Sequence, residues 1–242
     1  RTDTNGACPT MKVIQALADE PLEFEPGEHF NYSLCHDVLG GLIEVITGQT
    51  LGEYMRETIF NPLDMKSTGF KLIKDDSDRM AKLYVVDSKP ILTDKNAYCL
   101  GSEYESGGAG LISTVDDYIK FLECLSGGGN TPDGENILSR STINLMRTNQ
   151  LDSKRLSEFW ESNKVRTGYG YGLGVRMITD RALAGTNGTL GAFGWPGAAG
   201  AYTIADPDIE LSVFYAQHIV GMNPLLNIHP RIRNIIYSCL DK

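Results

Sequence analysis

Apolar side chains recur at helical spacing in the first part of the chain, and local signals mark where each helix begins and ends. After Asp37 the apolar positions are Val38, Leu39, Leu42, Ile43 and Ile46. This spacing predicts a helix with one apolar face, which ends at Gly48. Thr50 and Glu53 have the spacing of a capping box, so a second helix should begin there and continue to about Ile59.

A third helix is predicted after the glycine-rich segment 107–112. Ser113 or Thr114 can cap its N-terminus. Its apolar stripe consists of Val115, Tyr118, Ile119, Leu122 and Leu125. Three glycines at 127–129 predict its end.

Four other segments have weaker patterns. Short helices are predicted over 11–18 and 137–148. Segment 71–105 mixes short apolar runs with charges, so loops and short strands are expected there. The charged segment 152–166 is expected to lie on the surface.

The period becomes alternating after residue 168. Tyr169, Tyr171, Leu173, Val175 and Met177 alternate with Gly170, Gly172, Gly174 and Arg176. This alternation predicts one strand with an apolar face and a glycine-lined face. Two more strands, over 199–205 and 209–217, are separated by the turn residues 206–208 and form a hairpin. With a final helix over 224–240, the order of elements indicates an α+β fold whose antiparallel sheet has about three strands.

Composition and charge exclude several kinds of partner. The formal net charge is −9 and no basic run occurs, so nucleic acid is not an expected partner. No apolar run approaches the roughly 20 residues of a membrane-spanning helix. The five cysteines are scattered without a C-x-x-C pair, and no H-E-x-x-H occurs, so we predict neither a metal nor another cofactor. Such cysteines favour a reducing compartment such as the cytoplasm, but the localisation stays unknown.

Tyr32 is the first candidate for chemistry, because it stands at the turn that leads into the first long helix. A loop exposes the side chain, and the start of a helix favours an anion nearby. A free tyrosine ionises near pH ~10, so it needs a neighbouring cation to act as a base near neutrality. The alternative is a packing tyrosine whose hydroxyl lies at the surface.

Four runs around Tyr32 carry a family resemblance: FEPG at 24–27, YSL at 32–34, DVLGG at 37–41 and IFNPLDM at 59–65. They resemble the serine β-lactamase/penicillin-binding-protein superfamily, and within it the esterase-like branch related to class C β-lactamases. The resemblance implies a β-lactamase/transpeptidase-like fold, with a serine nucleophile and a lysine on an S-x-x-K helix. Tyr32 matches the tyrosine that shares the proton transfer. Leu34 occupies a position where β-lactamases usually have asparagine, which favours esters as substrates.

The segment GWPGAAG at 194–200 matches a second motif of that superfamily. Its K-T-G or W-x-G position lies at a strand edge and completes the oxyanion hole. By this resemblance Trp195 and Gly197 form the motif, and Ala198 donates the N–H. Two oriented donors can stabilise a transition state by a few kcal/mol. Trp195 replaces a lysine that would hold a β-lactam carboxylate, which again favours esters. A glycine-rich turn with a packing tryptophan is the structural alternative.

The S-x-x-K element itself is absent. No serine in the 242 residues is followed three positions later by lysine. In the superfamily the nucleophile helix precedes the tyrosine, whereas only 31 residues precede Tyr32 here. We therefore expect that the N-terminal part of the fold is missing, and that it belongs to a longer protein or to a separate chain.

Two functions follow from this expectation. The first is a serine hydrolase that acts on a small-molecule ester, or on a β-lactam or peptide amide, through an acyl-enzyme. The second is a non-catalytic fragment or ligand-binding remnant of the fold. In either case the expected organisation is a mainly helical lobe over 1–166, which carries Tyr32, and a lobe over 167–242, which carries the sheet, the W-x-G motif and the last helix.

Overall fold

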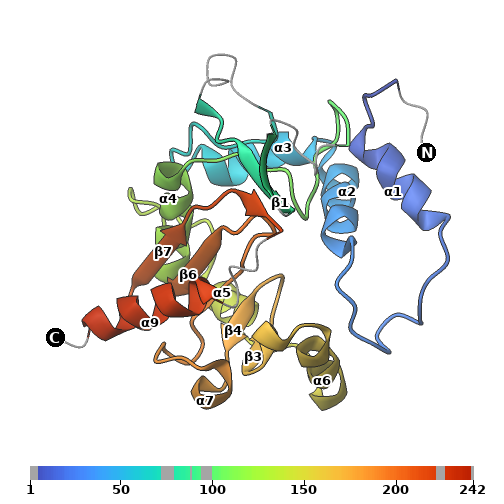
Figure 1. Ribbon diagram of the computed structural model, residues 1–242. Helices are drawn as coiled ribbons and strands as arrows, with labels where there is room; N and C mark the ends of the chain where they lie inside the picture. Colours follow the sequence, from blue (N-terminus) through green and yellow to red (C-terminus); the bar gives the residue numbers. More distant parts are fainter. Residues whose placement is uncertain (1–4, 72–78, 88, 94–99, 222–226, 241–242) are drawn as a thin grey trace.

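A five-stranded antiparallel sheet forms the centre of the molecule (Figure 1). This computed structural model describes residues 5–71, 79–87, 89–93, 100–221 and 227–240. The strand order is β3-β4-β5-β6-β7. The strands are β3 Tyr169–Tyr171, β4 Arg176–Ile178, β5 Phe193–Gly194, β6 Tyr202–Asp206 and β7 Leu211–Tyr215. Because each neighbouring pair is antiparallel, the predicted α+β class and the predicted β6–β7 hairpin are confirmed.

Helices cover both faces of this sheet. The covering helices are α4 Val115–Ser126, α5 Arg140–Met146, α6 Ser153–Ser162 and α9 His229–Leu240. In Figure 1, α9 lies in front of β6 and β7, and α4 lies behind them. Successive strand residues point to opposite faces, so in β4 Met177 packs with Leu122 of α4, while Ile178 packs with Tyr237 of α9. The core therefore has two apolar layers, one on each side of the sheet.

The predicted single strand over 169–177 is wrong, because this segment forms the β3–β4 hairpin. Gly174 has a φ of +76°, a left-handed conformation that glycine adopts without steric cost. The N–H of Gly172 donates to the carbonyl oxygen of Val175 at 2.8 Å and closes the turn. The apolar alternation runs straight through this turn and hides it. Together with β5, which has only two residues, the hairpin makes five strands where about three were predicted.

The helices before the sheet follow the local signals closely. They are α1 Thr10–Ala18, α2 Cys35–Thr47, α3 Leu51–Met55 and a π-helical turn, Arg56–Phe60. Gly48 ends α2 with a φ of +71°. The Thr50 hydroxyl accepts from the N–H of Glu53 at 3.2 Å, and the Glu53 carboxylate accepts from the N–H of Thr50 at 2.9 Å. The predicted capping box is confirmed. The Thr114 hydroxyl caps α4 by accepting the N–H of Asp117, as predicted for this residue.

Segment 152–166 was predicted to lie on the surface, but the structure shows that part of it is buried. It forms α6 and then a 3₁₀ turn, η3, over Lys164–Arg166. Asp152 caps α6 by accepting the N–H of Arg155 at 2.9 Å. The charged residues Asp152, Lys154 and Glu161 are exposed, but Phe159 is fully buried in the core. The high density of charge in the sequence hides this apolar face.

A small second sheet lies beside the first and has the order β2-β1-β8. Its strands are β1 Leu83–Asp87, β2 Lys89–Thr93 and β8 Ile219–Val220. Elsewhere, a short helix, α7, spans Arg181–Ala184 between β4 and β5. The predicted short strands of segment 71–105 are confirmed where they are described. The parts predicted over 72–78, 94–99 and 224–226 lie outside the described residues.

The proposed lobe boundary at residue 166 stays a prediction. Helices α4, α5 and α6, which precede it, pack on the sheet that follows it. Within the described part of the chain, no helix has the length and apolar character needed to cross a bilayer.

Candidate active site

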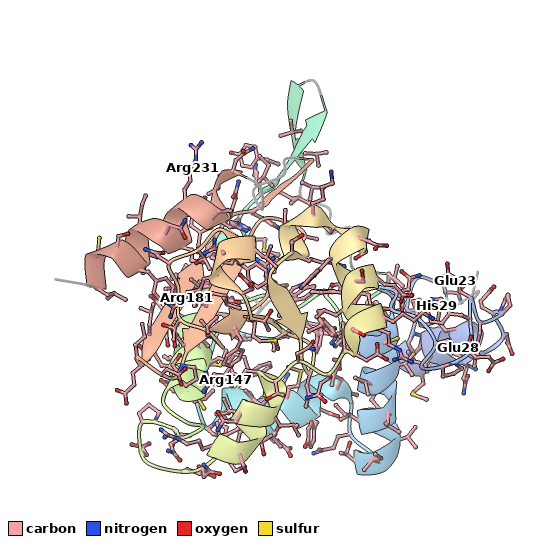
Figure 2. The ribbon with its side chains drawn as sticks, turned by 90° about the horizontal axis from the view of Figure 1, so that it is seen from below. Glu23, Glu28, His29, Arg147, Arg181 and Arg231 are labelled. Atoms are coloured by element: carbon pink, nitrogen blue, oxygen red, sulfur yellow. The ribbon has the colours of Figure 1, made fainter. Side chains whose placement is uncertain are left out.

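The loop before Tyr32 is fastened to α6 by polar contacts. Glu158 accepts the backbone N–H of Phe30 at 2.7 Å and contacts Nδ1 of His29 at 2.7 Å. Lys154 donates to the carbonyl oxygen of Glu28 at 3.1 Å. The Phe30 N–H, and after it His29, lower the pKa of the Glu158 carboxyl. Figure 2 shows Glu28 and His29 at one end of the molecule, away from Arg147, Arg181 and Arg231.

Aromatic contacts hold the same loop on the core. The Phe30 ring meets the rings of Phe159 and Tyr171 edge-on, with centroids 5.2 and 5.4 Å apart. Two residues later the chain presents Tyr32, and α2 begins at Cys35. Helix α6 thus positions the Tyr32 loop through both polar and aromatic contacts. The sequence reasoning missed this function of α6, although the cap at Asp152 and the apolar spacing of Leu156 and Phe159 are signals that could have revealed the helix.

The structure brings Tyr32 and Trp195 together. Their rings are stacked, with centroids 5.6 Å apart and an angle of 9° between the planes. The edge of Tyr171 meets Trp195 at 5.8 Å. Tyr32 is 52% exposed, so its side chain remains accessible to a ligand. Tyr32 and Trp195, which are 163 positions apart in the sequence (195 − 32), therefore share one surface site.

Arg166 joins this aromatic pair, and sequence reasoning did not identify it. Its guanidinium carbon lies 5.4 Å from the Tyr32 ring centroid and 5.9 Å from that of Trp195. Burial lowers the pKa of Arg166, and the negative form of Tyr32 opposes that change. No local pattern marks an arginine that stacks on rings from distant segments.

The segment after Trp195 forms a tight turn. Gly197 donates its N–H to the carbonyl oxygen of Ala201 at 2.8 Å, and Gly200 donates to the carbonyl oxygen of Gly197 at 3.0 Å. The backbone of Trp195 is tied to the hydroxyl of Thr203 by two hydrogen bonds, of 2.9 and 3.1 Å. Ala198, at the tip, is exposed. Among the described residues its N–H meets no acceptor, so this turn can offer a backbone donor to a bound oxyanion.

The histidines near this region have structural partners. His218 bonds through Nδ1 to the carbonyl oxygen of Ala81 at 2.9 Å, and His229 bonds through Nε2 to that of Gly200 at 2.9 Å. Burial lowers the pKa of His229. The described part of the chain brings together no group of three side chains suited to hold a metal ion.

Known proteins share both the sequence pattern and the fold. The protein-family model described as "Beta-lactamase" matches residues 2–235. An uncharacterized protein of Mycobacterium tuberculosis is 34% identical over 209 residues, which cover 84% of this chain and 52% of that protein. Esterase EstB of Burkholderia gladioli is 26% identical over 248 residues, which cover 93% of this chain and 58% of the esterase. The chain spans about half the length of the curated relatives it matches.

A solved structure extends these similarities to three dimensions. The chain superposes on EstCE1, a hydrolase with promiscuous acyltransferase activity, with a TM-score of 0.76 and 27% sequence identity. The alignment covers 95% of this chain and 61% of the EstCE1 chain. The predicted β-lactamase/transpeptidase-like fold is confirmed by this superposition and by the family match. Since the family model matches nearly the whole chain, this protein belongs to the beta-lactamase family.

Proposed function

We propose that this chain is the part of a serine esterase that carries the proton-transfer tyrosine and the oxyanion-hole turn. The stacking of Tyr32 on Trp195, with centroids 5.6 Å apart, is the observation that supports this proposal most. It joins the tyrosine motif to the strand motif, and the exposed Ala198 follows at the next turn. The nucleophilic serine and its lysine then lie on a segment outside this chain.

The proposed reaction proceeds through an acyl-enzyme. The serine oxygen attacks the ester carbonyl carbon, and its proton passes to the lysine–Tyr32 pair. Ala198 N–H and the serine's own N–H stabilise the oxyanion of the tetrahedral intermediate. The intermediate expels the alcohol, which takes up that proton. Water then gives a proton to the same pair and attacks the acyl carbon; the bond to the serine oxygen breaks, the serine regains the proton and the carboxylic acid is released.

Esters are the substrates that the residues favour over β-lactams and peptides. Leu34 and Trp195 replace an asparagine and a lysine that the resemblance assigns to β-lactamases, and the second change removes a cation from the strand motif. Among the relatives, EstB is named an esterase, whereas a relative in Escherichia coli is named a putative D-alanyl-D-alanine carboxypeptidase. An ester substrate is therefore the proposal, and a peptide amide is the competitor.

A non-catalytic role is the second candidate. The observation that favours it is the absence of an S-x-x-K element from the 242 residues. In that case the Tyr32–Trp195 surface would bind a ligand without chemistry.

Hydrolysis by material that contains both this chain and the segment proposed to carry the nucleophile tests the proposal. We expect p-nitrophenyl butyrate to be cleaved faster than a chromogenic cephalosporin or a D-alanyl-D-alanine peptide. Tyr32→Phe should lower kcat by about 10²-fold or more, because it removes a proton-transfer group. Tyr84→Phe is the matched control, since Tyr84 is also about half exposed and lies on β1.

Three results would contradict parts of this proposal. Equal activity of the two tyrosine variants would remove Tyr32 from the reaction. Faster cleavage of the cephalosporin or the peptide would overturn the substrate class. No cleavage of any of the three would favour the ligand-binding alternative.

A further inference from the structure

We propose that Arg166 is a positioning residue that holds the Tyr32 and Trp195 rings in register across the site. The inference rests on the proposed function of these two residues. The guanidinium carbon of Arg166 lies 5.4 Å from the Tyr32 ring centroid, 5.9 Å from that of Trp195 and 5.0 Å from that of Phe159. One planar cation thus contacts both site rings and a ring of the buried core.

The surroundings of Arg166 are unusual for an arginine of an acidic protein. The chain has 31 acidic residues against 22 basic ones. Yet within the described ranges no carboxylate lies at ion-pair distance from Arg166. The one side-chain hydrogen bond that the guanidinium makes there goes from Nη1 to the Ser162 hydroxyl at 2.6 Å. Its stabilising contacts are therefore mainly with aromatic faces, which a guanidinium stacks on better than an ammonium does.

The connectivity explains why such a contact matters. Tyr32 belongs to the loop before α2, Trp195 to the β5–β6 connection and Arg166 to η3. In the part of the chain that the structure describes, no hydrogen bond joins Tyr32 to Trp195. Arg166 touches both, and Ser162 and Phe159 of α6 fix its position. If the two rings move apart, the proton-transfer group shifts relative to the Ala198 turn, and shifts of about 1 Å can lower a rate substantially.

Trp195 itself can report on the contact. The chain has two tryptophans, and Trp160→Phe leaves Trp195 as the single tryptophan, whose fluorescence can be excited selectively over that of the tyrosines. In that background Arg166→Met keeps the apolar stem but removes the cation. We expect acrylamide quenching of Trp195 to rise by about twofold, because the ring loses a stacked neighbour. Arg166→Lys should restore only part of the protection, since it keeps the charge but lacks the planar group.

A matched control separates this effect from general loosening. Lys164→Met changes an exposed cation of the same 3₁₀ turn and should leave the quenching unchanged. The ¹H–¹⁵N spectrum of the protein with both tryptophans supplies a second measurement: the Trp195 indole signal should move in Arg166→Met, while that of Trp160 stays in place. An unmoved Trp195 signal together with unchanged quenching would overturn the proposal. If Arg166→Met unfolds, Arg166→Lys takes its place with the same readouts.

The catalytic side of the inference has a separate readout. In material that hydrolyses esters, Arg166→Met should lower kcat by about tenfold with little change in KM, because a misplaced group affects the transition state. Unchanged kcat with a moved Trp195 signal would leave Arg166 a structural contact only and overturn its positioning role. Because quenching and indole shifts need no turnover, this inference and the proposed hydrolysis can fail independently.

Discussion

Helices α2 and α4 have similar amphipathic sequences but very different surroundings. In α4 the apolar residues Leu122 and Leu125 are only 3% and 4% exposed, because they pack on the sheet. In α2 the apolar residues Leu42, Val45 and Ile46 are 50%, 67% and 73% exposed. Nothing among the described residues covers that face of α2. Periodicity therefore predicts which face of a helix is apolar, while another segment decides whether that face is buried.

The uncovered face lies next to the chemistry. Tyr32 stands three positions before α2, and Leu34, just before the helix, is also about half exposed. This agrees with the proposal that a segment carrying the nucleophile completes the site. The covered part of the molecule, by contrast, supplies its own partners on both sides of the sheet.

The largest expected contrast is between leucine truncations in the two helices. Leu122→Ala should lower the free energy of unfolding by about 3 kcal/mol, because it leaves a cavity in a closed core. Leu42→Ala should lower it by less than about 1 kcal/mol, because its side chain is half exposed. Urea unfolding of both variants measures the difference. Equal losses would show that α2 is as well packed in solution as α4.

Removal of a helix cap should have a smaller effect. The Thr114 hydroxyl accepts from the N–H of Asp117 at 3.1 Å. Thr114→Ala should cost about 1 kcal/mol of unfolding free energy, and Thr114→Ser should recover most of it. Chemical denaturation of the two variants tests this. A serine variant as weak as the alanine variant would argue against the hydroxyl contact.

The α6 contact to the Tyr32 loop should depend on pH. The pKa of Glu158 is lowered from its ordinary value of 4.5, chiefly by the N–H of Phe30. Its contribution to stability is therefore fully present above about pH 4.5 and is lost as the pH falls through the lowered value. On acidification below this range, the protection of the Phe30 amide against hydrogen exchange, relative to an unstructured amide at the same pH, should fall. In Glu158→Gln, which has no carboxylate to protonate, this protection should not change over the same range. Parallel pH profiles in the two proteins would contradict the contact.

The smallest expected effect concerns the uncovered face. Ile46→Ser should change the unfolding free energy by less than about 0.5 kcal/mol, because Ile46 is largely exposed in the folded chain. Ile46→Ser should also reduce the binding of a hydrophobic dye to the folded protein. As the control, Ile143→Ser at a buried position of α5 should lower the unfolding free energy strongly. A large stability loss in Ile46→Ser would show that this face is covered in solution.

Local signals in the sequence predicted local structure well. The capping box of Thr50 and the stop at Gly48 depend only on neighbouring residues, and both are confirmed. The β3–β4 hairpin was missed because its turn keeps the alternating pattern of a strand. Arg166 could not be predicted at all, because its role depends on rings that come together only in the fold.

The roles of the candidate site residues remain predictions. Tyr32, Trp195, Gly197 and Ala198 were chosen by resemblance to a family that is now established for this chain. The fold adds the stacking of Tyr32 on Trp195, which sequence spacing alone cannot provide.

Intact-protein mass spectrometry under denaturing conditions, before and after treatment with a fluorophosphonate probe, tests directly whether a segment outside this chain carries the nucleophilic serine. We expect the purified material to contain a second polypeptide, or one longer than the 26.6 kDa chain, that gains the mass of the probe. A single unlabelled species at 26.6 kDa would contradict catalysis by this chain and favour a ligand-binding role.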